Sequence, residues 1–221
     1  MGDESEPITA VAKAVEETAK TGRALVEAGS DLASFVGKAL GTVPEDTVGL
    51  LGGDHLRELR IRNLDKISRK TEEILRERGV EDPESIGPIA LLPALEAASE
   101  ETDETLQDMW ANLLANAMDP NKDTSLQRVF IETLTQFEPI DALVLNAAVN
   151  NFANKMFGEG AAADLISKRN SLASMSAERL AKLGCFWSDS RPEGNFNRKM
   201  NNLVSNLGTE LQRACNPNAA D

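Results

Sequence analysis

The sequence predicts a mainly α protein: a multi-helix bundle with a small C-terminal winged-helix-like part that contains a short β-hairpin. Aromatic residues are scarce, with no Tyr, two Trp and seven Phe in 221 residues, and this scarcity disfavours strands. Apolar residues recur at spacings of three and four along most of the chain, as in amphipathic helices. Only the C-terminal part changes character, where two short apolar runs flank the turn-rich sequence RPEGN.

Two helices rich in small residues are predicted at the N-terminus. The first, over residues 7–28, begins with Pro7 at a first-turn position, and the second covers residues 31–40. Glycine and proline punctuate the link that follows, so residues 1–48 are predicted to form an N-terminal segment of amphipathic helices.

Residues 49–158 are predicted to form the central helical core domain. Asp54 is a good N-cap for a long helix over residues 54–78. Pro93 either kinks a helix in the 89–101 region or marks its start. Thr102 or Asp103 is expected to cap the next helix, which ends before Pro120. Two more helices are predicted over residues 125–137 and 140–157.

Residues 159–221 are predicted to form the winged-helix-like segment. One or two helices are followed by CFWSDS, a turn, NNLVSN and a final helix over residues 207–215. The order helix, strand, turn, strand, helix is typical of a winged helix.

The charge is acidic overall but unevenly distributed. A net charge of −13 favours solubility and makes general nucleic-acid binding unlikely, because phosphate contacts need clustered Lys and Arg. Residues 57–78 are nevertheless basic, and residues 79–119 contain acids but no Lys, Arg or His. We expect these two segments to complement each other inside the protein; a docking surface is the alternative.

Compartment signals favour a reduced, cytoplasmic protein. Two cysteines, Cys185 and Cys215, are too few for a disulfide framework. The acidic N-terminus has no basic region leading into an apolar core, and no run of about 18 apolar residues is present.

The chain carries no recognisable catalytic pattern, so no catalytic, cofactor-binding or metal-ligating residue is predicted, and an enzyme is not expected. His55, the single histidine, stands at a helix start with no nucleophile motif near it. The sequence GLLGGD fits neither a P-loop nor a dinucleotide fingerprint. The Arg-x4–6-His pattern of helical ribonucleases fails at residues 62–69 and 169–176, where no histidine follows.

The stretch LQDMWANLLANAMDP, residues 106–120, combines an apolar helix face with a polar row. Trp110 is predicted to be the largest anchor of the core face. Asn is a poor helix former, so two of them in mid-helix suggest hydrogen bonds to a neighbouring loop or helix end. Asn→Ala at either is therefore expected to lower stability more than activity. The candidate seam or partner-contact residues are Asp108, Trp110, Asn112 and Asn116.

Several stretches together resemble the abortive infection alpha family of bacterial proteins. They cover residues 49–80, 91–120, 130–145, 172–187 and 203–215, so the similarity spans about 49–215. The order and spacing of these stretches carry the resemblance. In the family, an aliphatic pair usually follows the Arg-Leu-Gly-like element; in this chain, Cys185 and Phe186 follow the corresponding residues 179–184. The resemblance implies a role in defence against phage and supplies no catalytic residue.

Three functional hypotheses follow. The first is a non-enzymatic defence protein that works through a protein partner or a homo-oligomer. The second is a membrane-perturbing effector that uses helices within residues 8–40, although an interfacial helix usually carries more bases than this region has. The third is a nucleic-acid-binding regulator that uses the basic residues of the tail, and it ranks lowest. These candidate contact residues are Arg179, Lys182, Arg191, Arg198 and Lys199.

Overall fold

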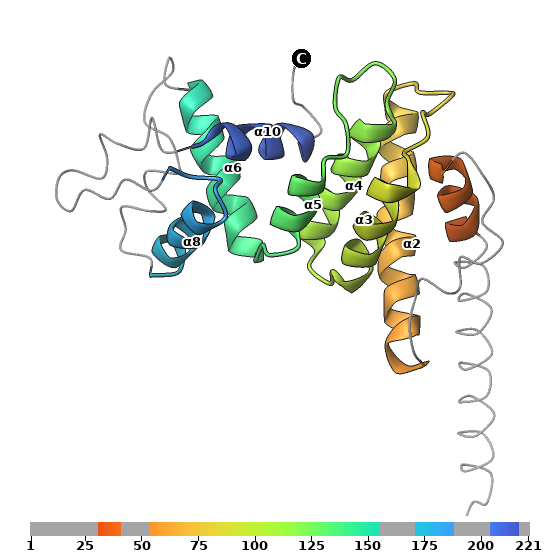
Figure 1. Ribbon diagram of the computed structural model, residues 1–221, viewed down its shortest axis with the longest axis horizontal. Helices are drawn as coiled ribbons and strands as arrows, with labels where there is room; N and C mark the ends of the chain where they lie inside the picture. Colours follow the sequence, from red (N-terminus) through yellow and green to blue (C-terminus); the bar gives the residue numbers. More distant parts are fainter. Residues whose placement is uncertain (1–30, 41–53, 155–170, 188–203, 217–221) are drawn as a thin grey trace, which may run out of the picture.

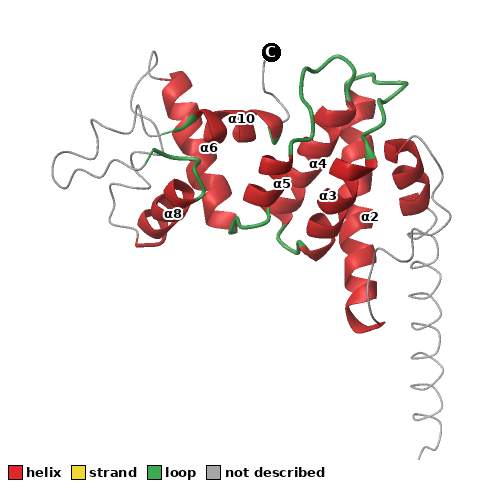
Figure 2. Cartoon of the chain, viewed as in Figure 1, coloured by secondary structure: helices red, strands yellow, loops and turns green. Residues whose placement is uncertain are grey.

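The computed structural model describes residues 31–40, 54–154, 171–187 and 204–216, and they form helices and the connections between them (Figures 1 and 2). The prediction of a mainly α protein is confirmed for these residues. The order is a helix over residues 31–40, then α2 (Asp54–Glu77), α3 (Pro88–Glu100), α4 (Glu104–Met118), α5 (Arg128–Leu134), α6 (Pro139–Asn154), α8 (Ser171–Lys182) and α10 (Asn206–Ala214). The predicted helix over residues 7–28 lies outside the described residues.

The first group of helices consists of the helix over residues 31–40 with α2, α3 and α4, at one end of the described molecule (Figure 1). The long helix α2 packs against both α3 and α4. Phe35 and Ala39 are buried on the inner side of the 31–40 helix. The Ile86 N–H donates to the Ala39 carbonyl (2.6 Å), and the Glu84 N–H donates to the Met118 carbonyl (2.8 Å). The loop between α2 and α3 therefore ties the 31–40 helix to the end of α4.

The predicted start of α4 is confirmed, whereas Asp54, predicted as the N-cap of the long helix, is the first residue of α2. Asp103 is the N-cap of α4, and its carboxylate accepts from the N–H groups of Thr105 (2.9 Å) and Leu106 (3.2 Å). These bonds satisfy two of the four free donors of a helix start. Pro93 lies inside α3, so it does not mark the start of that helix.

The second group consists of α6, α8 and α10, with α5 between the two groups (Figure 1). α6 packs against α8 and α10, and it also contacts α4, as α10 does. The Asp141 carboxylate, fully buried in α6, accepts from Ser176 Oγ (2.6 Å) and Arg179 Nε (2.7 Å) of α8. Both terminal nitrogens of Arg179 also donate to the Glu138 carboxylate, at 2.7 and 2.8 Å. This cluster fixes α8 against the first turn of α6.

The predicted winged-helix-like part with a β-hairpin is wrong. The described residues contain no strand, and the only pairing of strand type among them is one isolated antiparallel bridge between Phe186 and Val204 (Figure 2). The turn predicted at RPEGN falls in residues 188–203, outside the described part of the chain.

Helix caps adjoin this bridge in the chain, before Phe186 and after Val204. Before the bridge, Gly184 adopts a left-handed conformation (φ 80°), and the N–H groups of Cys185 and Phe186 both bond back to the Leu180 carbonyl. After it, Ser205 at once becomes the N-cap of α10 and accepts from the Gly208 N–H (3.0 Å). In the described part of the chain, the backbone groups next to the bridge are therefore used to end α8 and begin α10, and the strand pairing does not extend beyond Phe186 and Val204.

The predicted helix over residues 125–137 is shorter than expected, because α5 begins at Arg128 and ends at Leu134. Past its end, Gln136 and Phe137 bond back three residues, to the carbonyls of Thr133 and Leu134, in tighter turns. The division into segments 1–48, 49–158 and 159–221 stays a prediction.

Candidate functional site

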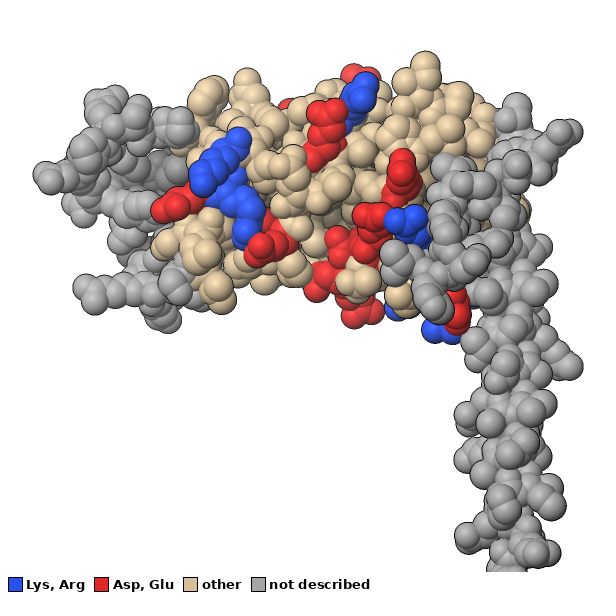
Figure 3. All heavy atoms as spheres, turned by 60° about the horizontal axis from the view of Figure 1, so that its bottom comes forward, with Lys and Arg blue, Asp and Glu red and all other residues tan. Residues whose placement is uncertain are grey.

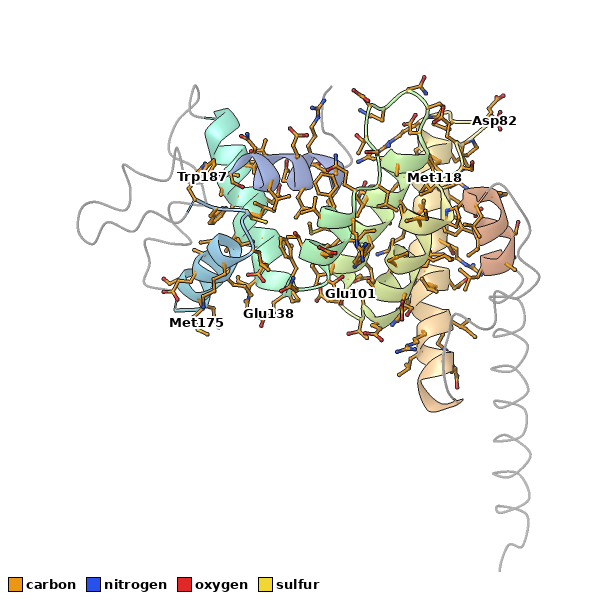
Figure 4. All side chains as sticks on the ribbon, viewed as in Figure 1. Asp82, Glu101, Met118, Glu138, Met175 and Trp187 are labelled. Atoms are coloured by element: carbon orange, nitrogen blue, oxygen red, sulfur yellow. The ribbon has the colours of Figure 1, made fainter. Side chains whose placement is uncertain are left out.

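Helix α4 runs through the centre of the described fold and carries the polar row that the sequence singled out. Trp110 is the largest of the fully buried side chains, and Leu113 and Leu114 beside it are also fully buried. Figure 4 marks the two ends of this region, with Glu101 in the turn before α4 and Met118 at its last residue. Trp110 therefore serves the core, and the chemistry of the helix lies with Asp108, Asn112 and Asn116.

Asp108 pairs with the long basic helix. Its carboxylate accepts from Lys70 Nζ at 2.5 Å, and the Asp108 side chain remains more than half exposed. Two similar pairs join the same segments, Arg60 with Glu100 (2.5 Å) and Arg78 with Asp119 (3.4 Å). The expectation that the basic segment 57–78 and the acidic segment 79–119 complement each other internally is thus confirmed.

Asn116 connects three parts of the fold. Its Nδ2 donates to the Ala214 carbonyl in the last turn of α10 (2.6 Å), and its Oδ1 accepts from Arg78 Nη1 (2.7 Å). The last carbonyls of a helix lack partners within that helix, so the amide caps α10 from outside. The side chain is almost fully buried. α2, α4 and α10 are thereby held at one point.

Asn112 is bonded differently, although it is also buried. Its Nδ2 donates to the Asp108 carbonyl of its own helix (2.8 Å), one turn back. Its Oδ1 is buried and has no hydrogen-bond partner among the described residues. Both Asp108 and Asn112 line a cavity between α4, α6 and the end of α10. The three residues of the predicted row therefore have different roles: Asp108 forms an ion pair, Asn112 lines a cavity, and Asn116 joins helices through hydrogen bonds.

The residues predicted for nucleic-acid contact do not form a free basic patch in the described part. Arg179 is committed to Glu138, labelled in Figure 4, and to the buried Asp141, and its hydrogen bond with Asp141 is the main cause of the raised pKa of its guanidinium. Lys182 is exposed at the end of α8. On the face shown in Figure 3, described Lys and Arg side chains lie beside Asp and Glu. Arg191, Arg198 and Lys199 lie outside the described residues.

Both thiols, Cys185 and Cys215, are buried, and Cys215 lines the same cavity as Asn112. Burial, with a smaller contribution from the Asp141 carboxylate, raises the pKa of Cys185 to about 12. Burial also raises the pKa of Cys215, and Cys185 adds to the rise. Such thiols stay protonated at neutral pH, and the thiolate is the reactive form.

Two further observations concern the hypothesis of a membrane-perturbing effector that uses residues 8–40. Within the described ranges, no helix combines the length and the apolar character needed to cross a membrane. In the described part of segment 8–40, the apolar side chains Leu32, Phe35 and Val36 are packed in the core, and Lys38 pairs with Glu72 (3.0 Å).

Sequence reasoning missed Arg78, the partner of Asn116, and the Asp141 cluster. Asp141 had a local signal. It stands three residues after Glu138, and its carboxylate accepts from the Glu138 N–H (2.8 Å), as in a capping box. Arg78 had no local signal in the sequence, because its partner Asn116 lies 38 positions away.

The geometry defines a helical protein whose charged and amide side chains mainly join helices to one another. The profile of the abortive infection alpha family matches residues 60–214, which is most of the chain, and the chain belongs to this family. The resemblance seen in the sequence is confirmed, and the family's description points to abortive infection as the setting in which the protein acts. No curated protein and no solved structure shows significant similarity to the chain.

Proposed function

We propose that this protein acts in bacterial defence against phage, in the cytoplasm, by binding a protein partner and not by catalysis. Membership of the abortive infection alpha family, over residues 60–214, carries the defence part of the proposal. The observation that supports a protein partner is a set of exposed apolar side chains on and after α8.

Leu172 and Met175 are each 59% exposed, and Trp187, a few residues beyond α8, is 58% exposed. Leu172 and Met175 are three residues apart in one helix, so they are neighbours on its surface. Met175 and Trp187 both lie at the end of the molecule built by α6, α8 and α10 (Figure 4). Met and Trp are enriched in protein interfaces, and Trp is frequent among the residues that dominate binding energy.

The α6–α8 cluster would hold this surface in place. Arg179 binds Glu138 and Asp141 from the same helix that carries Leu172 and Met175. A partner that docks on α8 therefore meets a helix whose position is fixed by a buried carboxylate, which reduces the ordering cost of binding.

The test compares phage plating on cells that express wild type, a Leu172→Glu/Met175→Glu double variant, or the control Ile89→Glu. Ile89 is an equally apolar side chain, 91% exposed on α3 in the other helix group. We expect wild type and I89E to reduce plaque formation, and the double variant to lose protection while keeping its helical circular dichroism and melting temperature.

Two results would count against the proposal. Full protection by the folded double variant would exclude this surface as the partner site. Single-residue-dependent turnover of RNA, DNA, NAD, nucleotides or peptides by purified protein would contradict the non-catalytic part.

A further inference from the structure

The outer face of α8 combines exposed apolar residues with one acid and one base. Met175, Glu178 and Lys182 follow one another at spacings of three and four residues, so they form one stripe along the helix. All three residues are exposed. Leu172 precedes this stripe in the chain, Trp187 follows the end of the helix, and both are exposed as well. We name these five residues the α8 face.

The two charges of the α8 face do not neutralise each other within one copy of the chain. Asp65 and Arg69 of α2, an acid and a base four residues apart, close into an ion pair (3.0 Å). Glu178 and Lys182 have the same spacing, and the acid precedes the base, which is the more favourable order. Yet no ion pair joins them among the residues that the structure describes. Both side chains can therefore pair with charges of another molecule.

The distribution of charge along the chain favours contact between two copies at this end of the molecule. The net charge of −13 arises from residues 1–119, since residues 120–221 contain as many Lys and Arg as Asp and Glu. Copies that approach each other through the acidic part repel, whereas α8 belongs to the neutral part. Next to the stripe, Arg179 is already neutralised by Glu138 and Asp141. The α8 face therefore meets a second α8 face without net repulsion.

The order of residues along the α8 face makes it complementary to itself about a two-fold axis. In an isologous contact the same patch meets itself, so each pairing between the copies occurs twice. When two α8 helices run antiparallel with the axis at the level of residue 180, Glu178 of each copy lies opposite Lys182 of the other. Met175 then lies about 7–8 Å from the axis, at 1.5 Å per residue, opposite the turn between the other copy's α8 and its Trp187. In Figure 4, Met175 and Trp187 lie toward opposite ends of α8, as this pairing requires.

We propose that the partner of the α8 face is a second copy of this chain, bound in an antiparallel α8–α8 contact. Two ion pairs between Glu178 and Lys182 set its register, and Met175 and Trp187 supply apolar contact on both sides. The inference rests on the proposed function, in which this surface binds a protein, and it names that protein. The α8 face is small beside a standard interface of about 20–30 residues a side, so the dimer is weak and depends on concentration.

Sedimentation equilibrium of the purified full-length protein over a concentration series measures the dissociation constant of the dimer. Glu178→Lys places like charges opposite each other at both symmetric positions, so we expect the dissociation constant to rise about tenfold. The double variant Glu178→Lys/Lys182→Glu exchanges the charges and should return the constant to within about threefold of wild type. Glu96→Lys, at an exposed position of α3, changes the net charge equally and should leave the dissociation constant unchanged.

The apolar part of the α8 face is tested with the variants of the plating experiment. Leu172→Glu/Met175→Glu should abolish the dimer, and the control Ile89→Glu should retain it, with circular dichroism verifying that each variant is folded. A wild type that is monomeric at every concentration, no recovery in the charge-exchange variant, or an equal effect of E96K would overturn the inference.

The same variants separate this inference from the proposed function. A monomeric wild type whose protection L172E/M175E removes would refute the second copy as partner and leave the proposed function intact. A wild-type dimer that L172E/M175E dissociates without loss of protection would support the dimer and contradict the proposed function.

Discussion

Replacing Asn116 by Ala should destabilise the protein far more than the same change at Asn112, one helical turn away. The Asn116 amide joins Arg78, α4 and the end of α10 through bonds of 2.7 and 2.6 Å. Among the residues that the structure describes, the Asn112 amide bonds only to a carbonyl of its own helix, and its oxygen has no partner. The two substitutions remove the same atoms from buried positions in one helix, so their difference isolates the interhelical bonds.

The magnitude follows from what Asn116→Ala leaves behind. A hydrogen bond to a charged group contributes about 1.5–3 kcal/mol, and a buried group left without its partner, here the Ala214 carbonyl, costs about 1–3 kcal/mol. The better helix propensity of Ala returns about 0.5 kcal/mol. We expect N116A to lower the free energy of unfolding by about 2–5 kcal/mol and N112A by less than about 1 kcal/mol.

Urea denaturation followed by far-ultraviolet circular dichroism measures both values. The exposed Asn150→Ala serves as a surface control, since Asn150 bonds only to Asn146 among the described contacts. Equal losses for N116A and N112A, or a loss below about 1 kcal/mol for N116A, would refute the role of Asn116 as a tie between helices.

Three further predictions concern the second helix group. Gly208→Ala should lower the free energy of unfolding by about 2 kcal/mol or more, because the added Cβ would lie 2.2 Å from the Cys185 carbonyl oxygen. The control Gly79→Ala adds only the backbone strain of a φ of 72°, so it should cost about 1 kcal/mol in the same urea titration. Asp141→Asn should lower the free energy of unfolding by about 2–4 kcal/mol, measured by thermal or urea unfolding, because it leaves Arg179 and Ser176 facing a neutral group in a fully buried position. A loss no larger than that of a surface substitution would contradict this. The contribution of Cys185 to stability should be fully present below pH 9.0, the unperturbed pKa of its thiol, and should be lost as the pH rises from there toward about 12, because the unfolded chain loses the Cys185 proton while the raised pKa keeps it in the folded state. Cys185→Ala should weaken the loss of stability at high pH and leave the part that comes from Cys215, whose pKa burial also raises; an unchanged pH dependence would contradict this.

Local signals in the sequence were sufficient for the start of α4 and for the pairing of the basic and acidic segments. Asp103 before an apolar periodic run predicts the start of α4, and the opposite charges of segments 57–78 and 79–119 predict the pairing that Lys70 and Asp108 show. These features depend on near neighbours or on the summed charge of a whole segment, so they can be read without knowing the fold.

The features that define the candidate site depend on contacts distant in sequence. Asn116 and Ala214 are 98 positions apart, and nothing local marks Ala214 as a partner. The cavity arises only where α4, α6 and α10 meet. The predicted wing is wrong for the described residues, where Phe186 and Val204 form only one isolated bridge, because the residues adjoining them, Gly184 and Ser205, belong to helix caps.

A one-step growth experiment tests the central functional claim most directly. Cells that express the protein are infected at high multiplicity, and cell survival and released phage are counted over one infection cycle. The proposal predicts that infected cells die or stop growing without releasing progeny, and that uninfected cells are unaffected. Normal phage release from expressing cells would contradict the claim that this chain acts in abortive infection.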